Sequence, residues 1–235
     1  MTLYLKQDDE LPLVQVSALI GSGTIGVHRD LAGFGGVFSE TLRTGGTANF
    51  SSSILEERLD ALAADLSVVM GAYTCQLNLS VRAEDLNEGL MLLAELLRYP
   101  TFDSDSLELA RLKSLESVRR QNDSPRSVAQ RLLLASLYPE HPLGDSPTQQ
   151  SLTRITHEDL VRFHQRHFVP NNLMLAVSGD FNQESLFATL QKLLGDWAPQ
   201  QTTNDSLPPV RKQESGEIQV VDKDLAQATI LLGDL

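Results

Sequence analysis

Residues 32–47 read Ala-Gly-Phe-Gly-Gly-Val-Phe-Ser-Glu-Thr-Leu-Arg-Thr-Gly-Gly-Thr. The stretch predicts a helix that carries Glu40. The pair Gly45-Gly46 predicts where that helix ends, because glycine readily adopts the left-handed backbone conformation found after many helices. The glycines near the helix start have no Walker lysine after them and no strand leading directly into them, which favours close helix packing over a phosphate loop.

Composition sets the broad class. The chain has 235 residues, of which 41% are hydrophobic and 21% charged, as is usual for a globular protein. A net charge of −12 argues against nucleic acid or an anionic membrane surface as a partner. We find no apolar run long enough to span a bilayer and no signal peptide in residues 1–10. A soluble protein of the bacterial cytoplasm or periplasm is therefore expected, with the compartment open.

Periodicity predicts the fold class. Apolar residues alternate in five segments that we expect to be strands, at 2–6, 13–20, 66–70, 73–81 and 172–178. Helical spacing predicts helices at 86–97, 105–122, 156–167 and 183–197, and another that starts at 125. Two helix starts are expected at Ser53-x-x-Glu56 and at Asp105-Ser-Leu-Glu108. Hairpins outnumber strict strand–helix–strand units, so we predict an α+β fold with a mainly antiparallel sheet.

The C-terminal part has a different character. Residues 198–215 are poor in aliphatic side chains and are expected to be a linker. Residues 216–235 then repeat the opening pattern of the chain, a short strand, a polar turn and an apolar strand that ends in glycine. We therefore expect a first domain at 1–197 and the beginning of a second, truncated homologous domain at 216–235.

The chain lacks one zinc-binding sequence pattern, His-x-x-Glu-His, although it has the turn that follows this pattern. In His-x-x-Glu-His helices, two histidines one turn apart bind the same zinc ion, and the glutamate acts as general base on the metal-bound water. Such a helix precedes a Gly-Thr turn in one peptidase class, and this chain has that turn at Gly46-Thr47. The single cysteine, Cys75, excludes an internal disulfide and is expected to be buried in a strand.

Several further segments carry a family resemblance. The chain resembles the pitrilysin family of zinc metallopeptidases, which includes insulinase and the mitochondrial processing peptidase, over nearly its whole length. The matching segments are Gly33 to Thr47, Leu59 to Ala64, Leu92 to Phe102, Leu115 to Arg120, His141 to Gly144, Ile155 to Phe163 and Phe168 to Asp180. Their order and spacing together are specific. The resemblance implies a metallohydrolase-like domain whose helices pack on one face of the sheet.

The family site can be transferred position by position. The resemblance places the two histidine positions on Val37 and Thr41, and the general base on Glu40. The third metal ligand falls on Ser117, with Glu116 as the carboxylate that would occupy this position if the register moved by one. One carboxylate does not replace two imidazoles, so the resemblance implies that the chain has lost the zinc site and binds no cofactor.

Other candidate residues have simpler explanations. His164-x-x-His167 has a spacing that can hold a metal on a helix, but a packed pair on one helix face is the expected arrangement. Glu40 has no evident partner in the sequence and is expected to be a solvated or hydrogen-bonded remnant. The basic residues around Arg119-Arg120, which include Arg111, Lys113 and Arg126, are expected to form a solvated helix face.

The resemblance implies a function without catalysis. In this family, active and inactive homologues pair within one chain or between chains and enclose unfolded peptide. We therefore expect a domain that pairs with an active peptidase homologue and binds extended peptide along a strand edge, with zinc only in the partner. Two alternatives stay open. One is a hydrolase with a rebuilt site that uses Glu40, Glu116 and a histidine, and the other is a protein-binding scaffold unrelated to proteolysis.

Overall fold

A five-stranded sheet forms the centre of the computed structural model, which describes residues 1–201, 209–210, 216–224 and 227–235. Its strand order is β1-β5-β2-β4-β3. The strands are β1 (Thr2–Gln7), β2 (Leu13–Ile20), β3 (Asp65–Met70), β4 (Cys75–Arg82) and β5 (Leu173–Gly179). Only the β1–β5 pairing is parallel. The predicted α+β fold with a mainly antiparallel sheet is confirmed.

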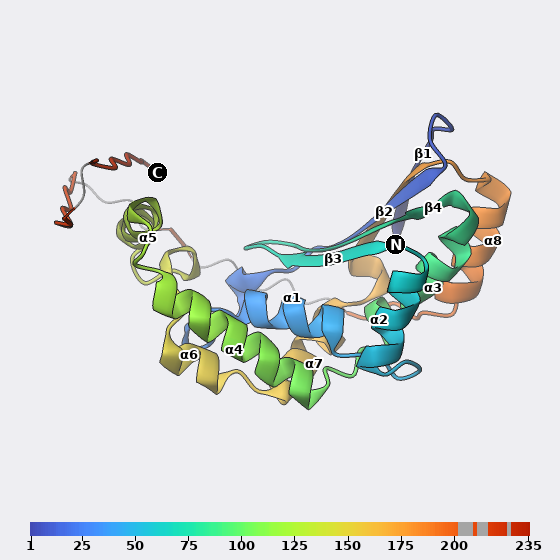
Figure 1. Ribbon diagram of the computed structural model, residues 1–235, viewed down its shortest axis with the longest axis horizontal. Helices are drawn as coiled ribbons and strands as arrows, with labels where there is room; N and C mark the ends of the chain where they lie inside the picture. Colours follow the sequence, from blue (N-terminus) through green and yellow to red (C-terminus); the bar gives the residue numbers. More distant parts are fainter. Residues whose placement is uncertain (202–208, 211–215, 225–226) are drawn as a thin grey trace.

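The helices gather on one side of this sheet, with α5 placed beyond its end (Figure 1). They are α1 (Phe34–Thr44), α2 (Ser52–Ala61), α3 (Leu86–Arg98), α4 (Ser104–Arg120), α5 (Pro125–Leu137), α6 (Gln149–Arg154), α7 (His157–His167) and α8 (Gln183–Leu194). In the described part of the chain, no helix is both long and apolar enough to cross a bilayer.

Strand alternation separates a buried face from an open one. The inward side chains of β2 and β4 are at most 2% exposed; they are Val14, Val16, Ala18, Ile20, Cys75, Leu77, Leu79 and Val81. The outward face carries polar groups instead, because Ser17 donates to Asn78 Oδ1 at 2.8 Å and Gln76 donates to Ser17 Oγ at 2.7 Å. Cys75 is buried as expected, and its burial raises the pKa of the thiol to about 12.

Aromatic rings fix α1 beneath the sheet. Phe38 of α1 lies 5.0 Å from the ring of Phe163 in α7 and 5.5 Å from that of Phe102. Phe34, one turn earlier on α1, lies 5.2 Å from Phe163. All four side chains are less than 10% exposed. Burying such rings contributes on the order of 2–3 kcal/mol each, so this cluster fixes the helix that carries Glu40.

Two predicted helix starts are wrong by two residues. Ser51, not Ser53, accepts the capping hydrogen bond from the Ile54 amide of α2, and Asp103, not Asp105, caps α4. Each sequence offers several polar residues in a row, and the chain path into the helix selects among them. Helix α2 ends at Ala61, and β3 begins at Asp65.

The ends of other helices were partly foreseen. Helix α5 begins at Pro125 as predicted, with Ser124 as its cap, and α7 begins at His157, within one residue of the prediction, with a capping box of Thr156 and Asp159. Helix α6 was missed because its six residues show too little periodicity. Helix α8 ends at Leu194, before the predicted Trp197, because Gly195 follows it.

The predicted linker and second domain stay predictions. Residues 202–208 and 211–215 of the expected linker, and 225–226 beyond it, lie outside the described residues. The described parts of 216–235 contain neither helix nor strand. Their aliphatic side chains Ile218, Val220, Ile230 and Leu232 are all more than 80% exposed.

We expect Gly179→Ala to lower the stability of the domain by about 2–4 kcal/mol. Gly179 has a φ of +126°, and a Cβ atom there would lie 2.1 Å from Leu13 O in the neighbouring strand. Thermal unfolding measures the effect, with Gly36→Ala as control because a Cβ at Gly36 meets nothing within 4 Å. Equal melting temperatures for the two variants would contradict this expectation.

Candidate functional site

Helix α1 carries the residues that the family motif singles out. Its N-cap Gly33 has a left-handed backbone, and Gly45 ends it by donating to Thr41 O at 2.7 Å. The predicted helix end at Gly45-Gly46 is therefore confirmed, with Gly46 at a φ of +71°. The side chains of α1 point in three directions, toward the core, toward strand β3 and toward helix α4.

Val37 and Thr41 belong to the core-facing side. Both side chains are completely buried, and Thr41 Oγ1 donates to Val37 O at 2.7 Å. That bond uses the hydroxyl within the helix itself. An apolar side chain and an internally bonded hydroxyl do not fit a zinc ion, which takes imidazole, thiolate or carboxylate ligands.

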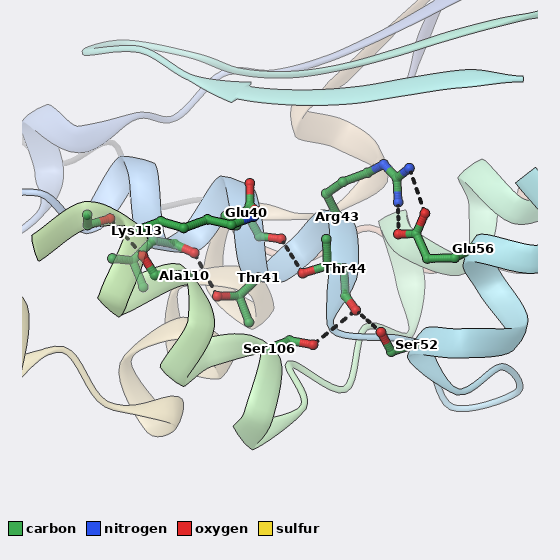
Figure 2. Close-up of polar contacts among 11 residues, drawn as sticks. Glu40, Thr41, Arg43, Thr44, Ser52, Glu56, Ser106, Ala110 and Lys113 are labelled. Carbon is green, nitrogen blue, oxygen red and sulfur yellow. Dashed lines mark hydrogen bonds and ion pairs between the residues drawn. The ribbon is translucent and has the colours of Figure 1, made fainter. Parts of the chain in front are cut away.

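Glu40 lies at the edge of this buried side. Its Oε1 pairs with Lys113 Nζ of α4, 73 residues away in sequence (Figure 2). Glu40 is therefore hydrogen-bonded, one of the two states expected for it, and Lys113 stays exposed on its helix face, although the sequence did not indicate this pairing. The side chains of Glu40 and Lys113 are 36% and 58% exposed, so the ion pair contributes at most about 1 kcal/mol. Sequence periodicity places both on helices but gives no sign that these helices adjoin.

The other α4 candidates are directed elsewhere. Ser117 and Glu116 are both exposed. Glu116 pairs with Arg120 at 2.7 Å and with Arg119 at 3.7 Å, both on its own helix. Among the α4 residues considered, the structure therefore brings Lys113 to Glu40. A cation now neutralises the carboxylate that the resemblance assigns to the general base.

A second pair on α1, one turn apart, is accessible. Gly36 is exposed and Glu40 is partly exposed. They precede the buried pair Val37 and Thr41 by one residue each. A glycine and an ion-paired carboxylate also make no zinc site. Among the described residues, no group of three or more histidine, cysteine, aspartate or glutamate side chains could hold a metal ion.

The third side of α1 meets strand β3. Arg43 Nε donates to Leu66 O at 2.6 Å, and its guanidinium also pairs with Glu56 of α2 (Figure 2). One turn earlier, Ser39 Oγ accepts a hydrogen bond from the Met70 amide at 3.0 Å. Sequence reasoning missed both residues. The only available signal was two polar residues at helical spacing next to an apolar stripe.

Two of the three histidines of α7, the pair His164 and His167, are packing residues in this structure. His164 and His167 are 7% and 8% exposed. His164 Nε2 lies 3.1 Å from Leu97 O, and its ring stacks on Phe168 at 4.5 Å. His167 lies 4.5 Å from the ring of Phe163. Burial lowers the pKa of His164 to about 4, so its imidazole is neutral near pH 7.

Two family models match the chain. Residues 3–150 match the insulinase family, peptidase family M16, and residues 154–233 match the peptidase M16 inactive domain. A zinc protease of Mycobacterium leprae, named as uncharacterized, is 25% identical over 96% of this chain and 52% of its own length. The non-peptidase homolog YmxG of Helicobacter pylori is 24% identical over 92% of this chain and 50% of its own. The chain thus spans about half the length of these relatives.

Solved structures show the same fold. A peptidase M16 inactive domain from Pseudomonas fluorescens superposes with a TM-score of 0.75 at 22% identity, over 89% of this chain and 51% of that one. A protease from Helicobacter pylori gives a TM-score of 0.74 at 17% identity, over 88% and 50% of the two chains.

Introducing histidine at neighbouring α1 positions should have opposite outcomes. Val37→His is expected to cost about 2–4 kcal/mol of stability, because a larger polar ring enters a filled core. Gly36→His should be tolerated or stabilising, since the site is open and glycine is a poor helix former. Urea unfolding of both variants tests this. A Val37→His variant as stable as the parent would show that the buried side has room for a ligand.

Acid should destabilise the protein through His164. The unfolded chain takes up this proton near pH 6.5, whereas the folded chain resists it until about pH 4. Stability is therefore expected to fall between these values as pH is lowered, by a few kcal/mol at most. His164→Gln should reduce this slope in urea titrations at several pH values, and Gly36→Ala, which removes no titratable group, should leave it unchanged. Identical slopes for the parent and His164→Gln would contradict the assignment.

Proposed function

Because the chain belongs to the M16 (insulinase) family of peptidases, we propose that it is a non-catalytic domain that pairs with an active zinc-peptidase homologue to enclose extended peptide. The complete burial of Val37 and Thr41 carries the proposal. At the two positions that the resemblance assigns to the histidine ligands, this chain has core side chains in an otherwise preserved peptidase-type scaffold.

The charge balance around Glu40 supports the same conclusion. In an active helix the glutamate acts on a water molecule bound to the metal. Here Lys113 supplies the positive charge next to the carboxylate, and a lysine ammonium donates hydrogen bonds without binding a nucleophile. Zinc is accordingly proposed only for the partner, which would carry His-x-x-Glu-His.

The shape of the domain supports a role in enclosing peptide. In Figure 1 the helices lie on one side of the sheet, so the other side is available as a wall. That open face carries the polar groups Ser17, Gln76 and Asn78 at its centre, with exposed apolar side chains that include Tyr4, Val69 and Met174 around them. Relatives about twice as long have room for a second domain, which supports tandem or paired assembly. Edge strands are proposed to bind the peptide backbone.

A scaffold role without proteolysis also has specific support. One relative, 23% identical over 75% of this chain, is named subunit 1 of the human mitochondrial cytochrome b-c1 complex. The rebuilt-hydrolase alternative has less support, because Glu116 pairs with Arg119 and Arg120 while Glu40 pairs with Lys113.

Purification from the native host distinguishes the role of peptidase partner from the scaffold role. We expect a homologue with His-x-x-Glu-His to co-purify with this chain in equal amount. Zinc and peptide hydrolysis should follow the homologue and disappear when its two histidines are replaced. The chain alone should contain far less than one equivalent of zinc.

Two results would overturn the proposal. Stoichiometric zinc with peptide turnover in the isolated chain would show an active enzyme. Recovery of only unrelated proteins, with no peptidase homologue, would favour the scaffold role.

A further inference from the structure

Strand β3 is an edge of the sheet, so its backbone has one unpaired side. The Gly71 amide donates to Thr74 O at 2.8 Å at the hairpin end, and Met70 faces Cys75 in the next pair. Hydrogen-bonded and non-hydrogen-bonded pairs alternate along antiparallel strands. Met70, Val68 and Leu66 therefore turn their N–H and C=O groups away from β4, toward the position that an added strand would occupy.

Side chains of helix α1 already bond to two of these outward groups, one near each end of the strand. Arg43 Nε donates a hydrogen bond to Leu66 O at 2.6 Å, and Ser39 Oγ accepts one from the Met70 amide at 3.0 Å. The two side chains are one turn apart on α1, about 6 Å along its axis, whereas four strand residues span about 13 Å, so the long Arg43 side chain covers the difference. Between them, among the described residues, Val68 is the outward-facing residue of β3 to which α1 makes no hydrogen bond at either its N–H or its C=O group.

Neighbouring contacts hold Arg43 and α1 in place. The Arg43 guanidinium pairs with Glu56 of α2, and its side chain is only 21% exposed. At the helix end, Thr44 O accepts hydrogen bonds from Ser106 Oγ at 3.1 Å and from Ser52 Oγ (Figure 2). These bonds link α1 to both α2 and α4. The cover over the β3 edge is therefore part of the packed structure.

We propose that Ser39 and Arg43 close the β3 edge, so that an extended peptide pairs with this strand only after both side chains release it. The peptide as ligand rests on the proposed function, but the closure itself does not. Strand addition requires successive outward N–H and C=O groups, and a single position at Val68 offers too few. Closure also protects an edge strand from pairing with other chains.

Amide exchange tests the closure directly. In Ser39→Ala the Met70 amide loses its acceptor, and we expect its hydrogen exchange to accelerate about tenfold or more. Arg58→Ala is the matched control, because it breaks an exposed ion pair with Glu88 that touches α2 and α3 but not β3. Unchanged exchange at Met70 in Ser39→Ala, with the fold intact by circular dichroism, would overturn the proposal.

Peptide binding tests the consequence. The probe is a fluorescein-labelled Lys-Thr-Val-Thr-Val-Thr-Lys peptide, titrated by fluorescence anisotropy. The double variant Ser39→Ala/Arg43→Ala is expected to bind it about tenfold or more tightly than the parent, since two competing hydrogen bonds are removed. Arg58→Ala should bind it as the parent does. Equal affinity of the parent and the double variant would overturn the gating role.

Two safeguards keep the outcome clear. If the double variant does not fold, Ser39→Ala alone decides, through both Met70 exchange and peptide affinity. These measurements use the chain without any partner, so failure to co-purify a peptidase homologue would count against the proposed function and leave the closure untouched. Conversely, a confirmed peptidase partner with unchanged Met70 exchange would count only against the closure.

Discussion

The packing of α1 against the aromatic core is the constraint on which the rest of the site depends. Once Phe34 and Phe38 are buried, the rotation of the helix is fixed. The directions in which the remaining α1 side chains point are then fixed as well. Val37 and Thr41 turn inward, Ser39 and Arg43 meet β3, and Glu40 reaches Lys113. One helix thereby joins the core, the sheet edge and α4.

This division explains how a peptidase-family scaffold can accommodate core side chains on α1. Zinc ligands must reach a space that admits both metal and water, whereas core side chains must exclude water. The two demands are incompatible at the same position. At Val37 and Thr41 this chain satisfies the second demand. The neighbouring carboxylate of Glu40 keeps its charge and gains a lysine partner, so no unpaired charge is left at the surface of the helix.

Much of the fold could be predicted from the sequence, because it depends on local patterns. Alternation located all five strands, and the Gly45-Gly46 pair located the end of α1. Long-range neighbours could not be read in this way. Lys113 and Glu40 are 73 residues apart, and only the packing of two helices brings them together. The rotation of α1, which decides what Val37 faces, is likewise set by tertiary contacts with Phe102 and Phe163.

The position of β5 has a consequence for how the sheet forms. β1 and β2 are neighbours in sequence, yet β5 lies between them and pairs with both. The centre of the sheet therefore closes only when residues 173–179 join strands from the first twenty residues. Such distant pairing requires a long loop to close before the stabilising strand contacts form, and this slows folding. During synthesis, β1 must wait for its only partner in the sheet until the ribosome has released nearly the whole domain.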